Sequence, residues 1–217
     1  NRSRRMSPLE DILAANLRCW EIAISQQFPF GSDNLDISLH GFPIAVEIEK
    51  WLMRRGFCVL PVYEIAEQQY KGPQLFSCDG DFVAPDMLAL KKGGQILFVE
   101  AKYKTGWTYN RKCNRVETGI DLQHYLNYQE VANKTGLPLW IVFLQSGEST
   151  KDTRLNERTS RAGLYGNEIK CLIVRESHRH AGWGKGGMVY WSPDYPKHAP
   201  ALRLIAKYED INKKEEL

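Results

Sequence analysis

Three charged residues stand at the two ends of one short stretch of the chain. Residues 85–102 read PDMLALKKGGQILFVEAK, in which Asp86 precedes the first apolar run and Glu100 and Lys102 end the second. Paired glycines between two such runs are typical of a β-hairpin. Because side chains alternate along a strand, Glu100 and Lys102 project from one face, and the hairpin brings Asp86 to the same end. Two converging carboxylates make an oxygen site suited to a hydrated divalent cation such as Mg²⁺.

Charge at the end of an apolar hairpin needs compensation. An unpaired buried charge costs several kcal/mol, so a metal, a partner or a catalytic role is expected for these residues. The plain alternative is a surface salt-bridge cluster, which stabilises a fold only weakly. The Pro-Asp start, the Glu-x-Lys spacing and the order of the surrounding elements together favour a reactive cluster.

The residues Pro85-Asp86 and Glu100-Ala101-Lys102 resemble the PD-(D/E)XK signature of the restriction-endonuclease-like nuclease superfamily. The resemblance implies that Asp86 and Glu100 bind Mg²⁺, for which Mn²⁺ substitutes, and that the backbone carbonyl of Ala101 is a third ligand. Such a metal polarises a scissile phosphate and lowers the pKa of a bound water. Lys102 then orients or activates the water, or offsets developing negative charge, and both roles remain open.

Hydrophobic periodicity predicts the elements around this hairpin. An apolar stripe predicts a helix over 43–55, and 57–65 reads as a first strand that Pro61 places at an edge or a bulge. A helix over 120–134 and strands over 139–144, 169–174 and 188–191 follow. This order agrees with the αβββαβ core of the superfamily across residues 41–146. The expected fold is therefore α/β, with a restriction-endonuclease-like core whose mixed central sheet is flanked by helices.

Length and composition predict one globular domain with appendages. The chain has 217 residues, of which 43% are hydrophobic and 25% charged. A capped apolar stripe predicts a helical extension over 1–36 packed on a core of 37–175, with 176–217 as an elaboration of the same domain. The sequence shows neither a membrane-length apolar run nor a secretory signal, and its five cysteines are widely spaced. We therefore expect a cytoplasmic protein that binds no membrane.

A glutamate on the 43–55 helix is a further candidate for the site. Many members of the superfamily carry a glutamate near the metal on the helix before the first core strand. On a helical wheel Glu47 lies nearer the apolar stripe than Glu49, so we expect Glu47 to reach inward. A solvated helix glutamate is the alternative. A rival interpretation makes 35–39 and 44–49 a hairpin, but the apolar period continues beyond residue 49 and favours the helix.

A basic, aromatic segment follows Lys102. Residues 101–116 hold five Lys or Arg residues and no acid. Basic side chains contact phosphates and aromatic faces stack on unpaired bases, so we expect a loop that contacts DNA, although a solvated basic loop has the same composition. The glycine-rich segment 178–187 also offers backbone N–H groups to a DNA backbone. The expected nucleic-acid contacts are Lys104, Trp107, Arg111, Lys112, Arg115 and Lys185.

Two weaker signals lie farther along the chain. Some branches of the superfamily place a tyrosine four residues after a glutamine on the helix that follows the core hairpin. Here Asn127 follows Gln123 at that spacing and Tyr128 comes one residue later, so the branch stays unassigned and Gln123 is an accessory candidate or a solvent-facing residue. His178 and His180 have neither a cysteine nor a third histidine nearby, which argues against zinc.

The residues and the resemblance together predict a metal-dependent endodeoxyribonuclease of restriction, recombination or mobile-element type. Its expected substrate is DNA, double-stranded, and a homodimer is the arrangement that many members of the superfamily adopt. A Holliday-junction or repair nuclease is one alternative. A noncatalytic DNA-binding module with the same fold is the other. The net charge of +3 is too small to decide for a nucleic-acid partner by itself.

Overall fold

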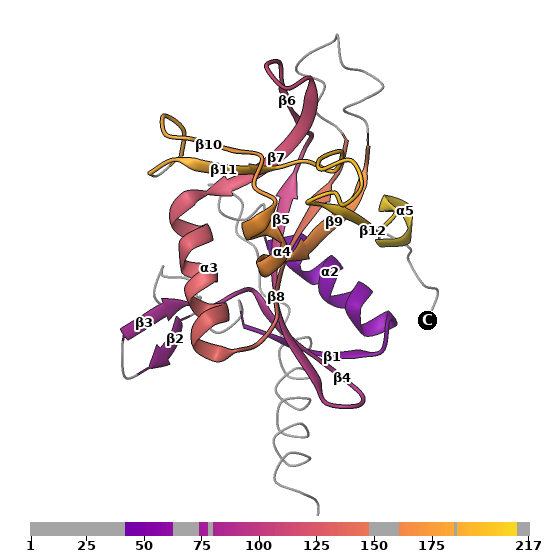
Figure 1. Ribbon diagram of the computed structural model, residues 1–217. Helices are drawn as coiled ribbons and strands as arrows, with labels where there is room; N and C mark the ends of the chain where they lie inside the picture. The colour runs from indigo at the N-terminus through magenta and orange to yellow at the C-terminus, as the bar shows by residue number, and fades with distance from the viewer. Residues whose placement is uncertain (1–41, 63–73, 78–79, 148–160, 185, 212–217) are drawn as a thin grey trace, which may run out of the picture. The chain divides into compact units, whose positions relative to one another are not determined.

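The computed structural model describes residues 42–62, 74–77, 80–147, 161–184 and 186–211 (Figure 1). The helical extension predicted over 1–36 and the candidate contact Lys185 lie outside these residues. Within the described part of the chain, the helices are too short or too polar to cross a membrane.

The described elements alternate between strands and helices. In chain order they are α2 (Phe42–Arg54), β1 (Phe57–Pro61), β2 (Gln74–Ser77), β3 (Gly80–Val83), β4 (Met87–Lys91), β5 (Gln95–Lys104), β6 (Thr108–Asn110), β7 (Arg115–Asp121), α3 (Leu122–Thr135), β8 (Leu139–Gln145), β9 (Gly163–Glu168), α4 (Ile169–Val174), β10 (His178–His180), β11 (Met188–Trp191), β12 (Arg203–Ala206) and α5 (Tyr208–Ile211). The predicted helix over 43–55 is confirmed as α2, so the rival hairpin over 44–49 is wrong.

A six-stranded mixed sheet forms the centre of the fold. Its strand order is β1-β4-β5-β8-β9-β12. Only the β5–β8 pair is parallel, and α3 lies in the crossover that a parallel pair requires. The predicted mixed sheet with flanking helices is confirmed, and so is the edge position of the strand that contains Pro61. The assignment of this sheet to a restriction-endonuclease-like core remains a prediction.

The predicted β4–β5 hairpin is confirmed, with Lys91 opposite Gln95 across the turn. The amide of Gly94 donates to the Lys91 carbonyl over 3.1 Å. Both turn glycines have positive φ, 103° at Gly93 and 87° at Gly94, a conformation that side chains disfavour. The glycine pair therefore fixes the register that sets Asp86 beside Glu100.

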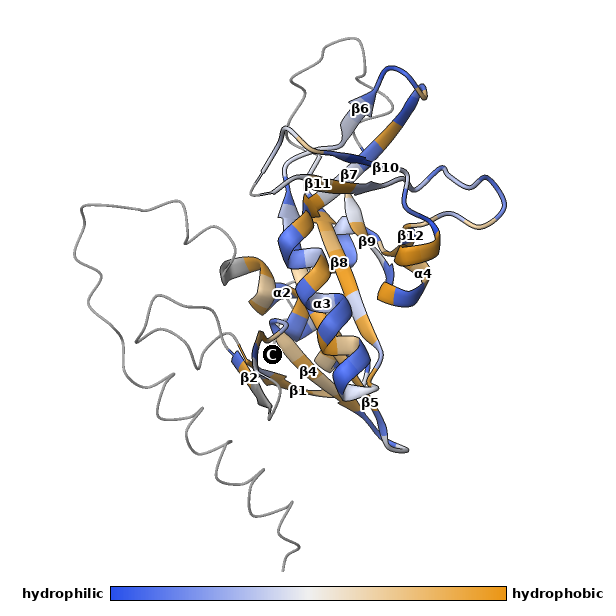
Figure 2. Ribbon diagram, turned by 60° about the vertical axis from the view of Figure 1, so that its left-hand side comes forward, coloured by the Kyte–Doolittle hydropathy of each residue, from blue (hydrophilic) through white to orange (hydrophobic). Residues whose placement is uncertain are grey.

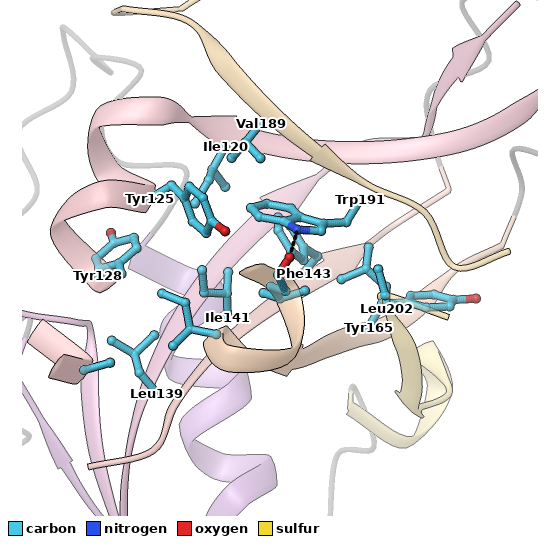
Figure 3. Packing of buried hydrophobic residues seen from close by; sticks show 14 of the residues in the cluster. Ile120, Tyr125, Tyr128, Leu139, Ile141, Phe143, Tyr165, Val189, Trp191 and Leu202 are labelled. Carbon is cyan, nitrogen blue, oxygen red and sulfur yellow. Dashed lines mark hydrogen bonds between the residues drawn. The ribbon is translucent and has the colours of Figure 1, made fainter. Parts of the chain in front are cut away.

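Two apolar clusters cover the two faces of the central sheet. Helices α3 and α4 and strand β11 pack on one face, where Tyr125, Leu172 and Trp191 are fully buried (Figure 3). Helices α2 and α5 pack on the other face through Ile48 and Ile211. Figure 2 shows β8 as a largely hydrophobic strand between these layers, as its continuous apolar sequence predicts.

Helix α3 ends where the sequence predicts, because Gly136 adopts the left-handed conformation (φ 68°) that closes a helix. Its buried side chains are Tyr125, Tyr128, Val131 and Ala132. The apolar pattern of this helix also predicts Leu126 on its inner face, but that prediction is wrong, since this side chain is 43% exposed. The inner face of the helix is centred on the two tyrosines instead.

A second sheet, ordered β10-β11-β7-β6, stands beside the first in Figure 1. It contains most of the segment 101–116 that the sequence analysis treats as a loop. That expectation is wrong: β5 continues to Lys104, and a β6–β7 hairpin follows. Trp107 and Val116 anchor this hairpin in the core at 6% and 2% exposure, which explains why a basic segment is ordered.

The chain after β8 also differs from the prediction. Residues 169–174 form helix α4, because a short apolar run fits a buried helix as well as a strand. The strand is β9, whose glycines allow close packing. A Cβ added at Gly166 would lie only 2.6 Å from the carbonyl oxygen of Ile141. Because glycine in a sequence usually indicates a turn, the sequence pattern does not predict this strand.

Candidate functional site

Asp86 and Glu100 lie side by side at the end of the β4–β5 hairpin. The Asp86 amide donates to Glu100 Oε2 over 3.2 Å, and the Ala101 amide donates to Asp86 Oδ2 over 2.8 Å. Each carboxylate is therefore held by the backbone of the neighbouring strand. Glu100 is 2% exposed, so its charge is removed from water and has to be compensated inside the fold.

Lys102 supplies part of that compensation. Its Nζ forms an ion pair with Glu100 Oε1, and the two side chains leave β5 on the same face, as predicted. Burial by itself would lower the pKa of Lys102, but the carboxylates of Glu100 and Asp86 outweigh that effect and raise it. Lys102 therefore stays a cation across the physiological pH range.

Tyr128 completes the group from the opposite side. Its hydroxyl donates to Glu100 Oε1 over 2.6 Å, from a position on α3 that is 3% exposed. Burial and the nearby charge of Glu100 raise the pKa of Tyr128, so the phenol keeps the proton that it donates. Lys102 Nζ also lies 5.9 Å from the centre of the Tyr128 ring. In the sequence, Tyr128 lies one residue beyond the expected spacing from Gln123, so the pattern does not assign it to the site.

Asp121, at the N-terminus of α3, is a further acidic neighbour that the sequence analysis missed. Its negative charge raises the pKa of both Lys102 and Lys104. For Lys104, burial and repulsion by Lys102 still dominate, and the net effect lowers its pKa. A nearby anion such as a phosphate would favour the charged form of Lys104 and so oppose the lowering of its pKa. The only signal in the sequence was an acid directly before a helix.

Burial and the charge of Glu100 raise the pKa of Asp86 to about 7, from the ordinary 3.8, although Lys102 and the Ala101 amide oppose the shift. A divalent cation would relieve this repulsion. Mg²⁺ is typically held by one or two carboxylates together with water and phosphate oxygens, and Asp86 and Glu100 fit that donor set. Among the described residues, no group of three or more His, Cys, Asp and Glu side chains could hold a metal ion.

The raised pKa of Asp86 gives the metal-free protein a defined pH dependence. Between about pH 4 and pH 7 the unfolded chain loses the Asp86 proton while the folded chain keeps it, so stability falls as pH rises through this window. We expect Asp86→Asn to raise the free energy of unfolding by about 2 kcal/mol near pH 8 and to change it little near pH 4. Urea unfolding in the presence of EDTA measures this.

Asp81→Asn, at an exposed position in β3, is the control and should have little effect at either pH. An equal effect of Asp86→Asn at both pH values would contradict the raised pKa.

The hydroxyl of Tyr128 is expected to hold Glu100 in its reactive position. Tyr128→Phe removes the hydrogen bond to Oε1 without changing the ring, and outer partners of metal ligands typically contribute 10–100-fold, so we expect roughly that loss of affinity for a divalent cation at Asp86 and Glu100. A calorimetric titration of the protein with Mn²⁺ measures this. Tyr125→Phe is a matched control on the same helix, because its hydroxyl donates to Glu176 over 2.7 Å. Equal losses in the two variants would argue for a merely structural role of Tyr128.

The buried glutamate of α2 is Glu49, and the inward position predicted for Glu47 is wrong. Glu47 pairs with Lys50 over 3.2 Å at the protein surface. Glu49 is only 3% exposed. Helix α2 also packs against α5, where the Arg54 guanidinium donates to the Ile211 carbonyl over 2.9 Å. The buried arc of α2 is therefore wider than its apolar stripe.

The structure separates the predicted nucleic-acid contacts into two groups. Arg111 and Lys112 are exposed in the β6–β7 turn, and Lys104 continues the line of Glu100 and Lys102 along β5. Trp107 is in the core, where its Nε1 donates to the Arg161 carbonyl over 3.1 Å, so its ring is not exposed for the predicted contact with nucleic acid.

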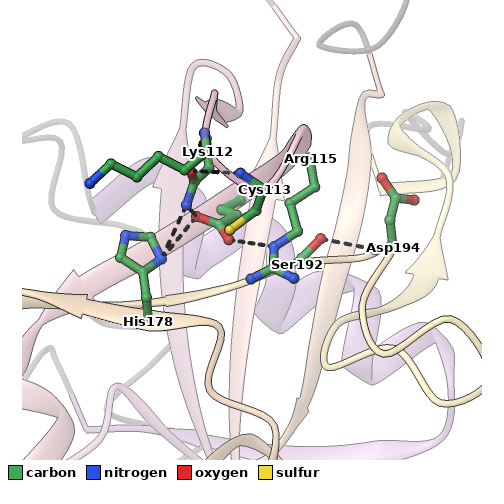
Figure 4. Close-up of polar contacts among 8 residues, drawn as sticks. Lys112, Cys113, Arg115, His178, Ser192 and Asp194 are labelled. Carbon is green, nitrogen blue, oxygen red and sulfur yellow. Dashed lines mark hydrogen bonds and ion pairs between the residues drawn. The ribbon is translucent and has the colours of Figure 1, made fainter.

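Arg115 is engaged by protein groups on the second sheet. Its Nε donates to Glu117 Oε1 over 2.8 Å, and its guanidinium lies 4.2 Å from the centre of the Tyr195 ring. His178 reaches the same buried glutamate from β10, with Nδ1 3.1 Å from Glu117 Oε2 (Figure 4). Arg115 therefore compensates the charge of Glu117, and the contact of His178 with the same carboxylate joins β10 to β7. His180 lies instead against Trp183, so the two histidines have different neighbours.

Gln123 is exposed on α3 and donates to Asn127 Oδ1 over 3.1 Å. The polar residue four positions before Tyr128 is His124, whose ring centre lies 6.3 Å from that of the tyrosine. His124 is therefore an exposed neighbour of the tyrosine that contacts Glu100. Gln123 is therefore solvent-facing, as the second of the two alternatives from the sequence predicts.

No protein family and no curated protein matches this chain. Among solved structures, the chain is similar to Hjc, a Holliday junction resolvase from the archaeal hyperthermophile Archaeoglobus fulgidus. The TM-score is 0.40 and the sequence identity is 12%, over 70% of this chain and 88% of that chain. A similarity at this level carries no argument about function, so the functional assignment depends on the geometry of Asp86, Glu100 and Lys102.

Proposed function

We propose that this chain is a divalent-metal-dependent nuclease that hydrolyses phosphodiester bonds in DNA. The observation that supports it is the joined group of Asp86, Glu100 and Lys102 at one end of a buried hairpin. Burial and the charge of Glu100 raise the pKa of Asp86 to about 7 there, and Lys102 forms an ion pair with the more buried carboxylate, Glu100. A surface salt bridge stabilises a fold only weakly, so it would not compensate for burying two carboxylates that repel each other.

Each residue has a definite role in the proposed reaction. Asp86 and Glu100 would hold Mg²⁺ or Mn²⁺, with the Ala101 carbonyl as the third protein ligand that the resemblance implies. When bound, such a metal polarises the scissile phosphate and provides a water of lowered pKa. Tyr128 and the Asp86 amide keep Glu100 fixed, so that its carboxylate does not have to reorganise during the reaction.

The raised pKa of Lys102 favours one of its two alternative roles. A general base needs a neutral amine, which requires a lowered pKa. The carboxylates around Lys102 act in the opposite direction and keep its ammonium charged. We therefore infer that Lys102 stabilises negative charge on the attacked phosphate and orients the water.

Lys104 and the exposed Arg111 and Lys112 would bind phosphates on either side of the scissile one. Lys104 leaves the same face of β5 as Lys102, and a phosphate would offset the burial and repulsion that lower its pKa. Contacts of this kind position the DNA without reading its sequence.

A cleavage assay on several DNA forms tests the proposal. Supercoiled plasmid, linear duplex, single strand and a four-way junction are incubated with Mg²⁺ or Mn²⁺ and with the wild type, Asp86→Ala or Asp81→Asn. We expect the wild type and Asp81→Asn to cut at least one form and Asp86→Ala to be inactive. If the wild type binds DNA in a gel shift but cuts none of these forms, the chain is a DNA-binding module. Cleavage that survives Asp86→Ala would overturn the site assignment.

A further inference from the structure

The β10–β11 hairpin brings an exposed tryptophan close to the candidate site. Trp183 is 63% exposed, although tryptophan is a large side chain that folded proteins usually bury in good part. Tryptophan is also enriched among the side chains that contribute most to binding a partner. Figure 1 shows this hairpin extending past the N-terminal end of α3.

The turn that carries Trp183 is fixed in place from both sides. The Gly182 amide donates to His180 Nδ1 over 3.2 Å, and the His180 and Trp183 rings meet edge to face with their centres 5.9 Å apart. At the other end of the turn, the Gly187 carbonyl accepts a hydrogen bond of 2.9 Å from the Leu122 amide, at the start of α3. The tryptophan is therefore presented on an anchored turn.

Gly184 links the turn to the charged residues of the site. A Cβ at this position would lie only 2.0 Å from Asp121 Oδ1, and its φ of 68° also favours glycine. Asp121 directly precedes α3, and Tyr128 of the same helix donates to Glu100. Trp183 thus stands one residue from a close approach to the N-terminal end of the helix that also contacts the candidate site.

We propose that Trp183 stacks on an unpaired base of the nucleic-acid substrate while the adjoining phosphates lie along Lys104 and Lys102. This inference rests on the proposed function and narrows its substrate to DNA with exposed bases, at a gap, a flap or a branch point. Every base has a π-face, so stacking tolerates any sequence but requires that the base is not already covered by its neighbours. In intact duplex that face is covered.

Binding measurements separate stacking from general DNA affinity. The Asp86→Ala chain, which is expected not to cut, is titrated against a fluorescent duplex containing a short single-stranded gap and against a fully paired duplex of the same length. Since stacking on one base typically contributes a factor of about 5–100 in affinity, we expect Trp183→Ala to weaken binding to gapped DNA by that factor. Binding to paired DNA should change by less than about twofold. Trp183→Phe should restore most of the loss.

Two further measurements make the test specific. 2-Aminopurine in the gap should be quenched on binding by the Asp86→Ala protein and not by the double variant with Trp183→Ala. Leu204→Ala, at a 53% exposed apolar position on the edge strand β12, should leave both affinities and the quenching unchanged. Equal losses on gapped and paired DNA, or quenching that persists without Trp183, would overturn the inference.

The inference and the proposed function fail in different ways. Asp86-dependent cleavage together with no selective effect of Trp183→Ala would refute the role of Trp183 and leave the nuclease assignment in place. Selective binding without cleavage by the wild type would refute the nuclease assignment alone. If the chain binds neither DNA, both are wrong.

Discussion

Lys102→Met is expected to lower the rate of metal-dependent DNA cleavage roughly 10²–10⁴-fold, the range typical for loss of one group that stabilises charge in a transition state. Methionine keeps much of the length of the side chain but has no charge. The change removes the cation paired with Glu100, which in the proposed reaction would stabilise negative charge on the attacked phosphate. Single-turnover cleavage with enzyme in excess measures the chemical step directly.

The protein surface offers a matched control for this variant. Lys50 pairs with Glu47 over 3.2 Å, but its side chain is 52% exposed. Lys50→Met should leave the rate within about twofold of the wild type. Lys102→Arg keeps a charge with a different shape and should recover only part of the activity. If Lys102→Met folds normally and cuts at the wild-type rate, the proposed role of this lysine is wrong.

Trp191→Ala is expected to lower the free energy of unfolding by about 3–5 kcal/mol, the largest effect on stability that we predict. The indole is fully buried between Tyr125 and Phe143, with ring centres 5.2 Å and 6.2 Å away. Its Nε1 donates to the Leu172 carbonyl over 3.0 Å (Figure 3). Removing it opens a cavity where β11, α3 and α4 meet, and urea unfolding measures the loss.

A second substitution separates packing from hydrogen bonding at Trp191. Trp191→Phe keeps most of the buried ring and should cost about 1–2 kcal/mol, because the Leu172 carbonyl still accepts a hydrogen bond from the Arg175 amide. Trp183→Ala removes an exposed indole and should change stability by less than about 0.5 kcal/mol. Similar losses for Trp191→Ala and Trp183→Ala would contradict this description of the core.

The sequence predicted the hairpin and its three charged residues correctly, because both depend on local patterns. A glycine pair fixes the turn, and alternation along β5 fixes the face that Glu100 and Lys102 share. The edge position of Pro61 was predictable for the same reason, since proline cannot donate to a second neighbouring strand.

Elements that depend on distant packing were not predictable in this way. Strand β9 exists because Gly166 lets β8 approach closely, and that contact has no trace in the sequence near it. The apolar run 169–174 forms a helix because Ile169 and Leu172 then project from one side into the apolar cluster that contains Trp191. Periodicity over six residues does not separate the two alternatives.

The same distinction applies to the residues around the site. A helical wheel ranks Glu47 ahead of Glu49 only if one partner covers the helix, whereas α2 packs against both the sheet and α5. Tyr128 reaches Glu100 because α3 crosses from β7 to β8 above β5. The spacing of residues within α3 could not show which turn of the helix lies over the carboxylate.

The backbone hydrogen bonds to Asp86 and Glu100 have a consequence for the cooperativity of the molecule. Strand β5 lies between β4 and β8 in the central sheet, and the amides of Asp86 and Ala101 donate to the two carboxylates. We expect these amide protons to exchange with solvent only when the sheet itself opens. The candidate site would then be among the last parts of the protein to unfold, and heating would remove its geometry and the native fold in one transition.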